Sequence, residues 1–163
     1  MVAILYNIRI VHNIGSIFRT ASAAGIKKLY LCGITPVPVD RFEKIRPRFS
    51  KVALGAEKYV LWEKHEKVEK VLDNLKSEGF SIIAVEQSKN SIQLNKFKIK
   101  NKNRKIALIF GNEVNGIPKS ILGKSDAILE IPIFGKKESL NVSVAFGVVV
   151  FHLALILNKK KIK

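Results

Sequence analysis

The chain has 163 residues, enough for one domain with a hydrophobic core, and its 47% hydrophobic content excludes a disordered protein. It carries 29 lysines and arginines against 13 aspartates and glutamates, which gives a formal net charge of +16. An ordinary solvated surface does not need such an excess, so nucleic acid is the favoured partner. An anionic membrane is disfavoured, because the apolar stripes look committed to a core. We expect a single domain over residues 1–163.

Short apolar runs rich in β-branched residues recur along the chain and predict buried strands. In chain order the runs span 2–5, 29–32, 59–62, 82–85, 106–110 and 128–131. Between several of them, apolar residues at helical spacing predict helices within 14–24 and over 65–77, with Gly25 and Gly79 where helices end. The alternation predicts an α/β fold with a mostly parallel sheet flanked by helices.

Residues 138–163 run from a polar opening into an almost wholly apolar tail. A membrane span needs ~20 apolar residues, more than the stretch 144–157 provides, and His152 interrupts that stretch. A buried helix is the favoured interpretation, with Asn141 or Ser143 as its N-cap and three cations near its end, Lys159, Lys160 and Lys161. Because this helix is apolar nearly all round, it must bury more than one face, which predicts a dimer.

Two further features bear on compartment and partner. Cys32 is the only cysteine, which excludes an internal disulfide, and the N-terminus has no secretion signal, so we expect a cytoplasmic protein without a membrane segment. The segment from Lys96 to Lys105 holds six basic and no acidic side chains. It is either a solvated linker that protects a sheet edge or a contact for RNA phosphate.

Three segments combine glycine with polar residues at the ends of predicted strands, where open α/β sheets bind ligands. They are NIRIVHNIGSIFRTASAAG, LIFGNEVNGIPKS and IPIFGKKESLNVS. In the second, Gly111 and Gly116 have the spacing of a phosphate-binding P-loop, but Ile117 and Pro118 stand where lysine and serine are required. A nucleoside triphosphatase is therefore excluded, and a glycine-bounded turn carrying Glu113 is left.

The first and third segments allow two interpretations each. A glycine turn at Gly15, preceded by Asn13, would let a ligand approach the backbone, while Arg19 presents a fixed fork of donors. These residues could equally be a helix cap and a surface arginine. Ser139 and Asn141 could likewise be capping residues only.

Taken in order, the motifs HNIGSIFRTASAAG, IFGNEVNGI and IPIFGKKESLNVSVAFG resemble the SpoU (TrmH-type) RNA 2′-O-ribose methyltransferases of the SPOUT superfamily. The resemblance covers nearly the whole chain and includes the stretch KVALGAEKYVLWE. It implies a sheet whose C-terminal part forms a deep trefoil knot, S-adenosylmethionine bound in the knot's loops, and a homodimer. It also implies a tRNA or rRNA substrate and a reaction without a metal. No appended RNA-binding domain is expected.

The resemblance also assigns roles to individual residues. It implies that the methyl donor is bordered, largely through backbone groups, by Gly111, Ile131 and Leu140. The catalytic and RNA-facing set would consist of Asn13, Arg19, Glu113, Ser139 and Asn141. A basic RNA-binding module without chemistry, the competing hypothesis, would not need this set.

Arg19 matches the family's proposed general base. A guanidinium has a pKa far above the physiological range and stays protonated in proteins. We therefore expect a charged Arg19 that holds a phosphate or the developing alkoxide, while water or RNA phosphate accepts the proton. His12 could contact RNA, whereas His152 is expected to be a core or interface residue, and His65 and Trp62 are expected to be structural or superficial.

Overall fold

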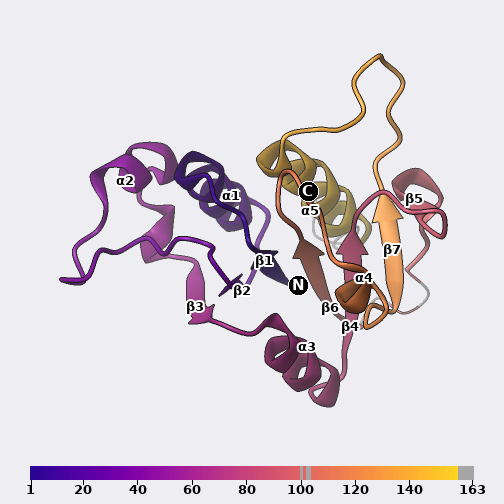
Figure 1. Ribbon diagram of the computed structural model, residues 1–163, viewed down its shortest axis with the longest axis horizontal. Helices are drawn as coiled ribbons and strands as arrows, with labels where there is room; N and C mark the ends of the chain where they lie inside the picture. The colour runs from indigo at the N-terminus through magenta and orange to yellow at the C-terminus, as the bar shows by residue number, and fades with distance from the viewer. Residues whose placement is uncertain (100, 102–103, 158–163) are drawn as a thin grey trace.

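Seven parallel strands form one sheet in the computed structural model, which describes residues 1–99, 101 and 104–157 (Figure 1). The strand order is β3-β2-β1-β6-β4-β7-β5, and each neighbouring pair is parallel. The strands are β1 (Val2–Tyr6), β2 (Lys28–Cys32), β3 (Leu61–His65), β4 (Phe80–Val85), β5 (Ile92–Gln93), β6 (Lys105–Phe110) and β7 (Ala127–Glu130). The predicted α/β class with a mostly parallel sheet is confirmed.

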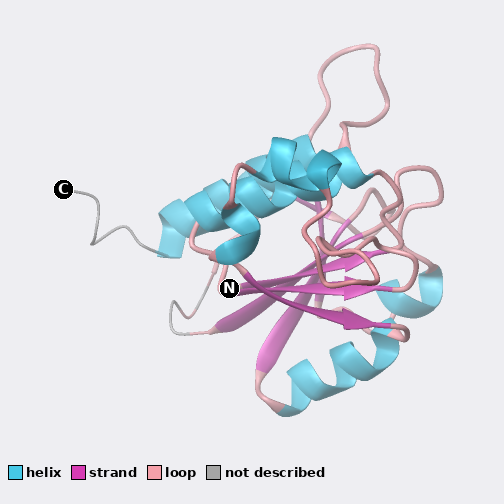
Figure 2. Cartoon of the chain, turned by 90° about the vertical axis from the view of Figure 1, so that its left-hand side faces the viewer, coloured by secondary structure: helices cyan, strands magenta, loops and turns pink. Residues whose placement is uncertain are grey.

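Helices cover both faces of this sheet (Figure 2). One face packs against α1 (Val11–Ala23), α2 (Pro47–Ala53), α5 (Val142–Leu157) and the short 3-10 helices η1 (Ala56–Lys58) and η2 (Leu94–Lys96). The other face packs against α3 (Val68–Ser77) and α4 (Lys119–Leu122). In β1, Ala3 and Leu5 face the first layer and Val2 and Ile4 face the second. Burial on both faces explains why the central strands are continuous apolar runs in the sequence.

The edge of the sheet is where two sequence predictions were wrong in detail. The strand expected at 59–62 forms instead at Leu61–His65, and Tyr59 and Leu61 are 80% and 68% exposed. The helix expected over 65–77 begins only at Val68, because His65 pairs with Cys32 in the sheet. An edge strand needs few buried side chains, so its hydrophobic pattern did not fix its limits.

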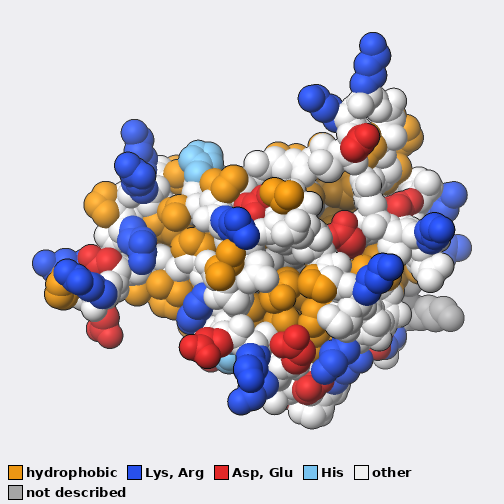
Figure 3. Space-filling view, viewed as in Figure 1, with side chains coloured by type: hydrophobic (Ala, Val, Ile, Leu, Met, Phe, Trp, Pro, Cys, Tyr) orange, Lys and Arg blue, Asp and Glu red, His pale blue; other side chains and the backbone are white. Residues whose placement is uncertain are grey.

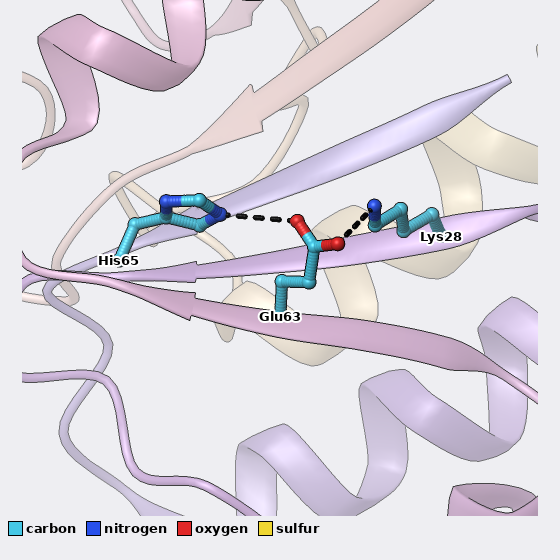
Figure 4. A network of polar contacts seen from close by, with 3 residues as sticks. All are labelled: Lys28, Glu63 and His65. Carbon is cyan, nitrogen blue, oxygen red and sulfur yellow. Dashed lines mark hydrogen bonds and ion pairs between the residues drawn. The ribbon is translucent and has the colours of Figure 1, made fainter.

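A short polar network ties β3 to its neighbour β2, and Figure 4 shows Glu63 between its two partners. Glu63 Oε1 lies 2.5 Å from Lys28 Nζ, and Glu63 Oε2 lies 3.2 Å from His65 Nε2. The hydrogen bond from Lys28 lowers the pKa of the Glu63 carboxyl, and the same bond raises the pKa of Lys28. The edge strand is therefore held by charge as well as by the ladder.

Gly15 has a different role from the one the sequence suggested. It lies within α1 rather than in a turn, and a Cβ there would come within 3.0 Å of Val52 Cβ and 3.2 Å of the Phe49 carbonyl oxygen. The missing side chain lets α2 pack closely on α1. The expected ligand approach at this glycine is thus a helix–helix contact.

The apolar C-terminal helix α5 lies along the sheet beside α1 (Figure 1). One stripe of α5 is buried, whereas Val144, Val148, Phe151 and Leu155 are 51%, 42%, 43% and 52% exposed. Within the described part of the chain, no helix combines the length and apolar character needed to cross a membrane. The lysines expected to follow this helix, Lys159 to Lys161, fall outside the described residues.

Two further sequence features, Cys32 and the basic segment from Lys96 to Lys105, lie in different surroundings. Burial raises the pKa of the Cys32 thiol to about 12, so this cysteine is a core side chain rather than a nucleophile. In the basic segment, Lys96 and Lys98 are exposed on and beside η2. Residues 100, 102 and 103 of that segment lie outside the described residues.

Candidate functional site

A cavity of about 250 Å³ lies where the carboxyl ends of β4, β6 and β7 meet. Parallel sheets commonly bind ligands at this edge. Apolar side chains from these strands and from the 131–141 loop form part of the wall: Val85, Phe110, Leu129, Ile131, Ile133 and Leu140. Gly111 and Ser139 also line the cavity. The cavity therefore combines apolar walls with the second and third sequence motifs.

The turn after β6 forms one rim of the cavity. Asn112 Oδ1 accepts hydrogen bonds from the backbone N–H of Val114 at 2.9 Å and of Asn115 at 3.0 Å. The chain then folds back so tightly that a Cβ on Gly111 would lie 2.6 Å from the carbonyl carbon of Gly116. Glycine is required at position 111 by this close approach. The glycine-bounded turn that the sequence predicted is present.

Glu86, which directly follows β4, holds the far side of the same turn. Its Oε2 accepts a hydrogen bond from the backbone N–H of Ile117 at 2.9 Å. The next residue, Gln87, donates from Nε2 to the backbone oxygen of Glu138 at 2.7 Å and so links β4 to the 131–141 loop. Sequence reasoning missed both side chains. Their position after a buried strand was the only available signal.

Three side chains from the three motifs form one hydrogen-bonded chain. Asn141 Nδ2 donates to Asn13 Oδ1 at 3.1 Å, and Asn13 Nδ2 donates to Glu113 Oε1 at 3.0 Å. The other carboxylate oxygen, Glu113 Oε2, accepts from the backbone N–H of Arg9 at 3.3 Å. Asn13 is 3% exposed, so its orientation is fixed by these bonds. The two side-chain hydrogen bonds join residues that are 100 and 128 positions apart in the sequence.

Asn141 has a second role, which the sequence predicted. Its Oδ1 accepts hydrogen bonds from the Ser143 backbone N–H at 2.8 Å and from Ser143 Oγ at 2.7 Å. These bonds cap the N-terminus of α5. One asparagine therefore caps the apolar helix and orients Asn13 at the same time.

Arg19 stands apart from the other expected site residues within one chain. Gly111, Glu113, Ile131, Ser139 and Leu140 line the cavity, and Asn13 and Asn141 are joined to Glu113 by hydrogen bonds. Arg19 instead lines a second hollow between α1 and α2. His12, Arg48 and Lys51 line this hollow as well, and no acidic side chain does so among the described residues. The two hollows thus differ in charge.

The cavity itself is acidic, although the protein is strongly basic. Glu86, Glu113 and Glu130 line it, and no lysine, arginine or histidine is among its described lining residues. Nearby carboxylates favour a ligand that carries positive charge. Across the described ranges, no three histidine, cysteine, aspartate or glutamate side chains are grouped so that they could hold a metal ion.

A parallel α/β sheet with a ligand cavity at its carboxyl edge defines the class of fold. Residues 1–151 match the model of the SpoU rRNA methylase family, so the chain belongs to that family. It is 32% identical over 147 residues to tRNA (guanosine(18)-2′-O)-methyltransferase of Borreliella burgdorferi and 31% identical over 146 residues to the enzyme of that name from Aquifex aeolicus. The matches cover 90% of this chain in both cases.

Solved structures give the same result. The A. aeolicus TrmH/SpoU tRNA modifying enzyme superposes with a TM-score of 0.82 at 28% identity, covering 98% of this chain and 76% of that one. A structure that addresses the 2-OH methylation of C/U34 on tRNA superposes with a TM-score of 0.79 at 26% identity, covering 96% and 95%. The chain spans 66% and 64% of the lengths of the two sequence relatives, so it matches only part of each.

Proposed function

We propose that this chain transfers a methyl group from S-adenosylmethionine to a ribose 2′-hydroxyl of tRNA or rRNA. The observation that carries the proposal is the hydrogen-bonded chain Asn141–Asn13–Glu113 beside the acidic cavity. It fixes polar groups from all three motifs at one edge of the sheet. Family membership and the tRNA methyltransferase names of the relatives support the same reaction.

The cavity fits S-adenosylmethionine by its chemistry. The donor combines a planar aromatic adenine with a sulfonium, an ammonium and one carboxylate. The apolar walls suit the faces of the ring, and Glu86, Glu113 and Glu130 suit the two cationic groups. Gly111, Ile131 and Leu140 would hold the donor, largely through backbone groups. When bound, the donor supplies an electrophilic methyl group on sulfur.

The protein's own residues would position and neutralise the RNA. Asn13, Glu113, Ser139 and Asn141 would orient the target ribose, because positioning in reactive geometry can contribute about 7 kcal/mol or more in ideal cases. Arg19, as a permanent cation on the basic hollow, would hold an RNA phosphate. The 2′-hydroxyl proton would pass to water or to an RNA phosphate.

Three further features complete the proposal. We propose a homodimer, supported by the exposed apolar stripe on α5. We propose a deep trefoil knot in the C-terminal part, supported by family membership and by a strand order in which β6 lies between β1 and β4, and β7 on the far side of β4. A cytoplasmic site of action and structured RNA as partner are part of the same proposal, because the net charge of +16 suits RNA.

Isotope transfer tests the reaction against the competing hypothesis of a non-catalytic RNA-binding module. The full chain should bind S-adenosylmethionine in calorimetry and transfer labelled methyl groups to bulk tRNA or rRNA. Nuclease digestion should then yield a 2′-O-methylated nucleoside. Asn13→Ala should cut turnover strongly while the protein stays folded. RNA binding without donor binding would favour the non-catalytic module.

A further inference from the structure

The loop between β7 and α5, residues 131–141, projects well beyond the body of the protein (Figures 1 and 2). Its tip is the stretch 134–137, which consists of Phe134, Gly135, Lys136 and Lys137. Phe134 is 95% exposed, more than any other large hydrophobic side chain among the described residues, and both lysines are exposed. Figure 3 shows basic side chains at the end of this projection.

The tip is exposed, but its base is anchored in the cavity wall. Ile133 precedes the tip and Ser139 and Leu140 follow it, and all three line the cavity. Gln87 Nε2 donates to the Glu138 backbone oxygen at 2.7 Å and fixes the returning arm. The loop that carries the tip therefore also forms part of the wall of the cavity proposed for methyl transfer.

An aromatic ring with adjacent cations suits one type of ligand. Phe134 contributes nothing to the core, and its exposed ring offers a face to another planar group. Unpaired nucleic acid bases stack on aromatic side chains with little regard to sequence, while lysines neutralise the phosphates beside them. A bare apolar patch would fit many proteins, but the two lysines and the net charge of +16 select RNA.

We propose that the 134–137 tip is an RNA-binding finger, in which Phe134 stacks on an unpaired base near the target nucleotide and Lys136 and Lys137 bind the adjoining phosphates. This inference rests on the proposed function only in placing the finger near a target nucleotide. The stacking and phosphate contacts themselves do not depend on that function. It specifies the substrate as RNA whose target region is single-stranded, such as a loop. The alternative is that a second copy of this chain covers Phe134 in a dimer, and the experiments below are designed to distinguish the two.

Fluorescence anisotropy with a labelled RNA stem-loop tests the stacking contact. Phe134→Ala should weaken binding about tenfold, within the range measured for loss of one stacked base. Phe134→Trp should restore it, because indole also stacks. Neither substitution should change the salt dependence, since no charge is altered. A blunt duplex of the same stem should bind equally well to wild type and to Phe134→Ala, and a loss of duplex binding as large as that for the stem-loop would overturn the assignment to an unpaired base.

Substitution of the two lysines, unlike that of Phe134, should change the salt dependence of RNA binding. For a single strand the slope of log K against log salt is about −0.7 per neutralised phosphate. Substituting both Lys136 and Lys137 by Gln should therefore make that slope shallower by about 1.4. Lys70→Gln with Lys76→Gln is the matched control, because both lysines are exposed on α3, on the opposite face of the sheet. Equal changes for the two pairs would refute a specific finger.

Three controls separate this inference from its competitors. Phe42 is 65% exposed and has Arg41 4.7 Å from its ring centroid, so an equal loss of RNA affinity in Phe42→Ala would show that any exposed aromatic serves. If wild type is dimeric in light scattering and Phe134→Ala is monomeric, Phe134 would be assigned to a contact with a second copy.

Calorimetry with S-adenosylmethionine should give the same donor affinity for wild type and Phe134→Ala. If wild type binds no donor but Phe134→Ala still weakens RNA binding, the methyltransferase proposal fails and the finger stands. If the donor binds and RNA affinity is unchanged, the finger alone fails.

Discussion

Arg19 is the residue whose position most constrains the mechanism. It lines a hollow shared with Arg48 and Lys51 and is absent from the described lining of the acidic cavity. Guanidinium groups as a class stay protonated in proteins, which makes them poorly suited to act as a base. Under the proposed function its partner in this hollow would be an RNA phosphate, which the planar fork can bind through two hydrogen bonds.

Substitution of Arg19 distinguishes a fixed cation from a base. Arg19→Lys keeps the charge but loses the fork, so single-turnover methylation should fall without vanishing. Arg19→Ala should slow it by ~10²- to 10³-fold, as loss of a preorganised donor typically does. Affinity for S-adenosylmethionine should stay the same in both variants. A lysine variant that equals wild type at high pH would support the base instead.

Gly111 is the second decisive residue, because the turn that bounds the cavity closes on it. A methyl group there would lie 2.6 Å from the Gly116 carbonyl carbon and 2.6 Å from Ile117 Cγ1. We expect Gly111→Ala to displace the 112–117 turn and to cost about 1–3 kcal/mol in the free energy of unfolding. Donor binding should be lost. Chemical denaturation and calorimetry measure the two effects, and unchanged values in both would mean that the turn is mobile.

At this scale the sequence predicted more than composition alone could. Ordered motifs led to Asn13, Glu113 and Asn141, which the structure joins by hydrogen bonds. Glu86 and Gln87 were missed because their role arises from contacts with residues about 31 and 51 positions away. No local pattern encodes such a contact. The same limit explains Gly15, whose neighbours on α2 are distant in sequence.

Among the elements, the edge strand β3 combines its backbone ladder with an ion pair and a carboxylate–histidine contact. Lowering of the Glu63 pKa stabilises the fold above the ordinary value of ~4.3, and this contribution is lost as pH falls through the lower folded value. Raising of the Lys28 pKa stabilises the fold below ~10.4, and this is lost as pH rises through the higher folded value. The ion pair therefore acts between these limits.

Glu63→Gln should cost only about 0.5 kcal/mol in the free energy of unfolding at neutral pH, because the Glu63 side chain is 48% exposed and solvent screens the pair. The difference from wild type should shrink below about pH 4, where the wild-type carboxylate becomes protonated. Urea denaturation at several pH values measures it. A double-mutant cycle with Lys28→Gln isolates the pair. A difference that stays constant down to pH 2 would argue against an ionic contribution.

Element limits were least predictable where burial is least. The central strands β1 and β6 are buried on both faces, and their apolar runs matched the observed positions to within one residue. At the sheet's edge, Leu61 is exposed and the strand instead includes Glu63, Lys64 and His65. The hydrophobic pattern of a sequence indicates which side chains are buried. A strand held mainly by backbone hydrogen bonds and charge is therefore poorly predicted from that pattern.

For the whole molecule, charge is divided between two regions with different tasks. The protein carries +16, yet the described lining of the cavity contains carboxylates and no cation. Under the proposed function, the outer basic surface would attract RNA from a distance, whereas the acidic cavity would repel phosphate and favour a cationic donor. The two proposed substrates would thereby be kept from competing for one site.

The oligomeric state is the last property that follows from the whole molecule. Val144, Val148, Phe151 and Leu155 recur at helical spacing on the exposed side of α5, forming an apolar stripe that water covers in a single chain. Burying this stripe against a second copy removes it from water, so we expect a dimer at micromolar concentration.

Charge placed on the stripe should break that dimer. Val148→Glu with Phe151→Glu would bring like charges together across a two-fold interface, where such pairs cost several kcal/mol, and should weaken association at least ~100-fold. Light scattering should give twice the chain mass for wild type and the mass of one chain for the variant, with an unchanged circular dichroism spectrum. Leu61→Glu, at an exposed leucine on the opposite edge strand, should stay dimeric. A monomeric wild type, or a double variant that stays dimeric, would contradict this assignment. In either case the apolar stripe on α5 would not be the surface that a second copy of this chain buries.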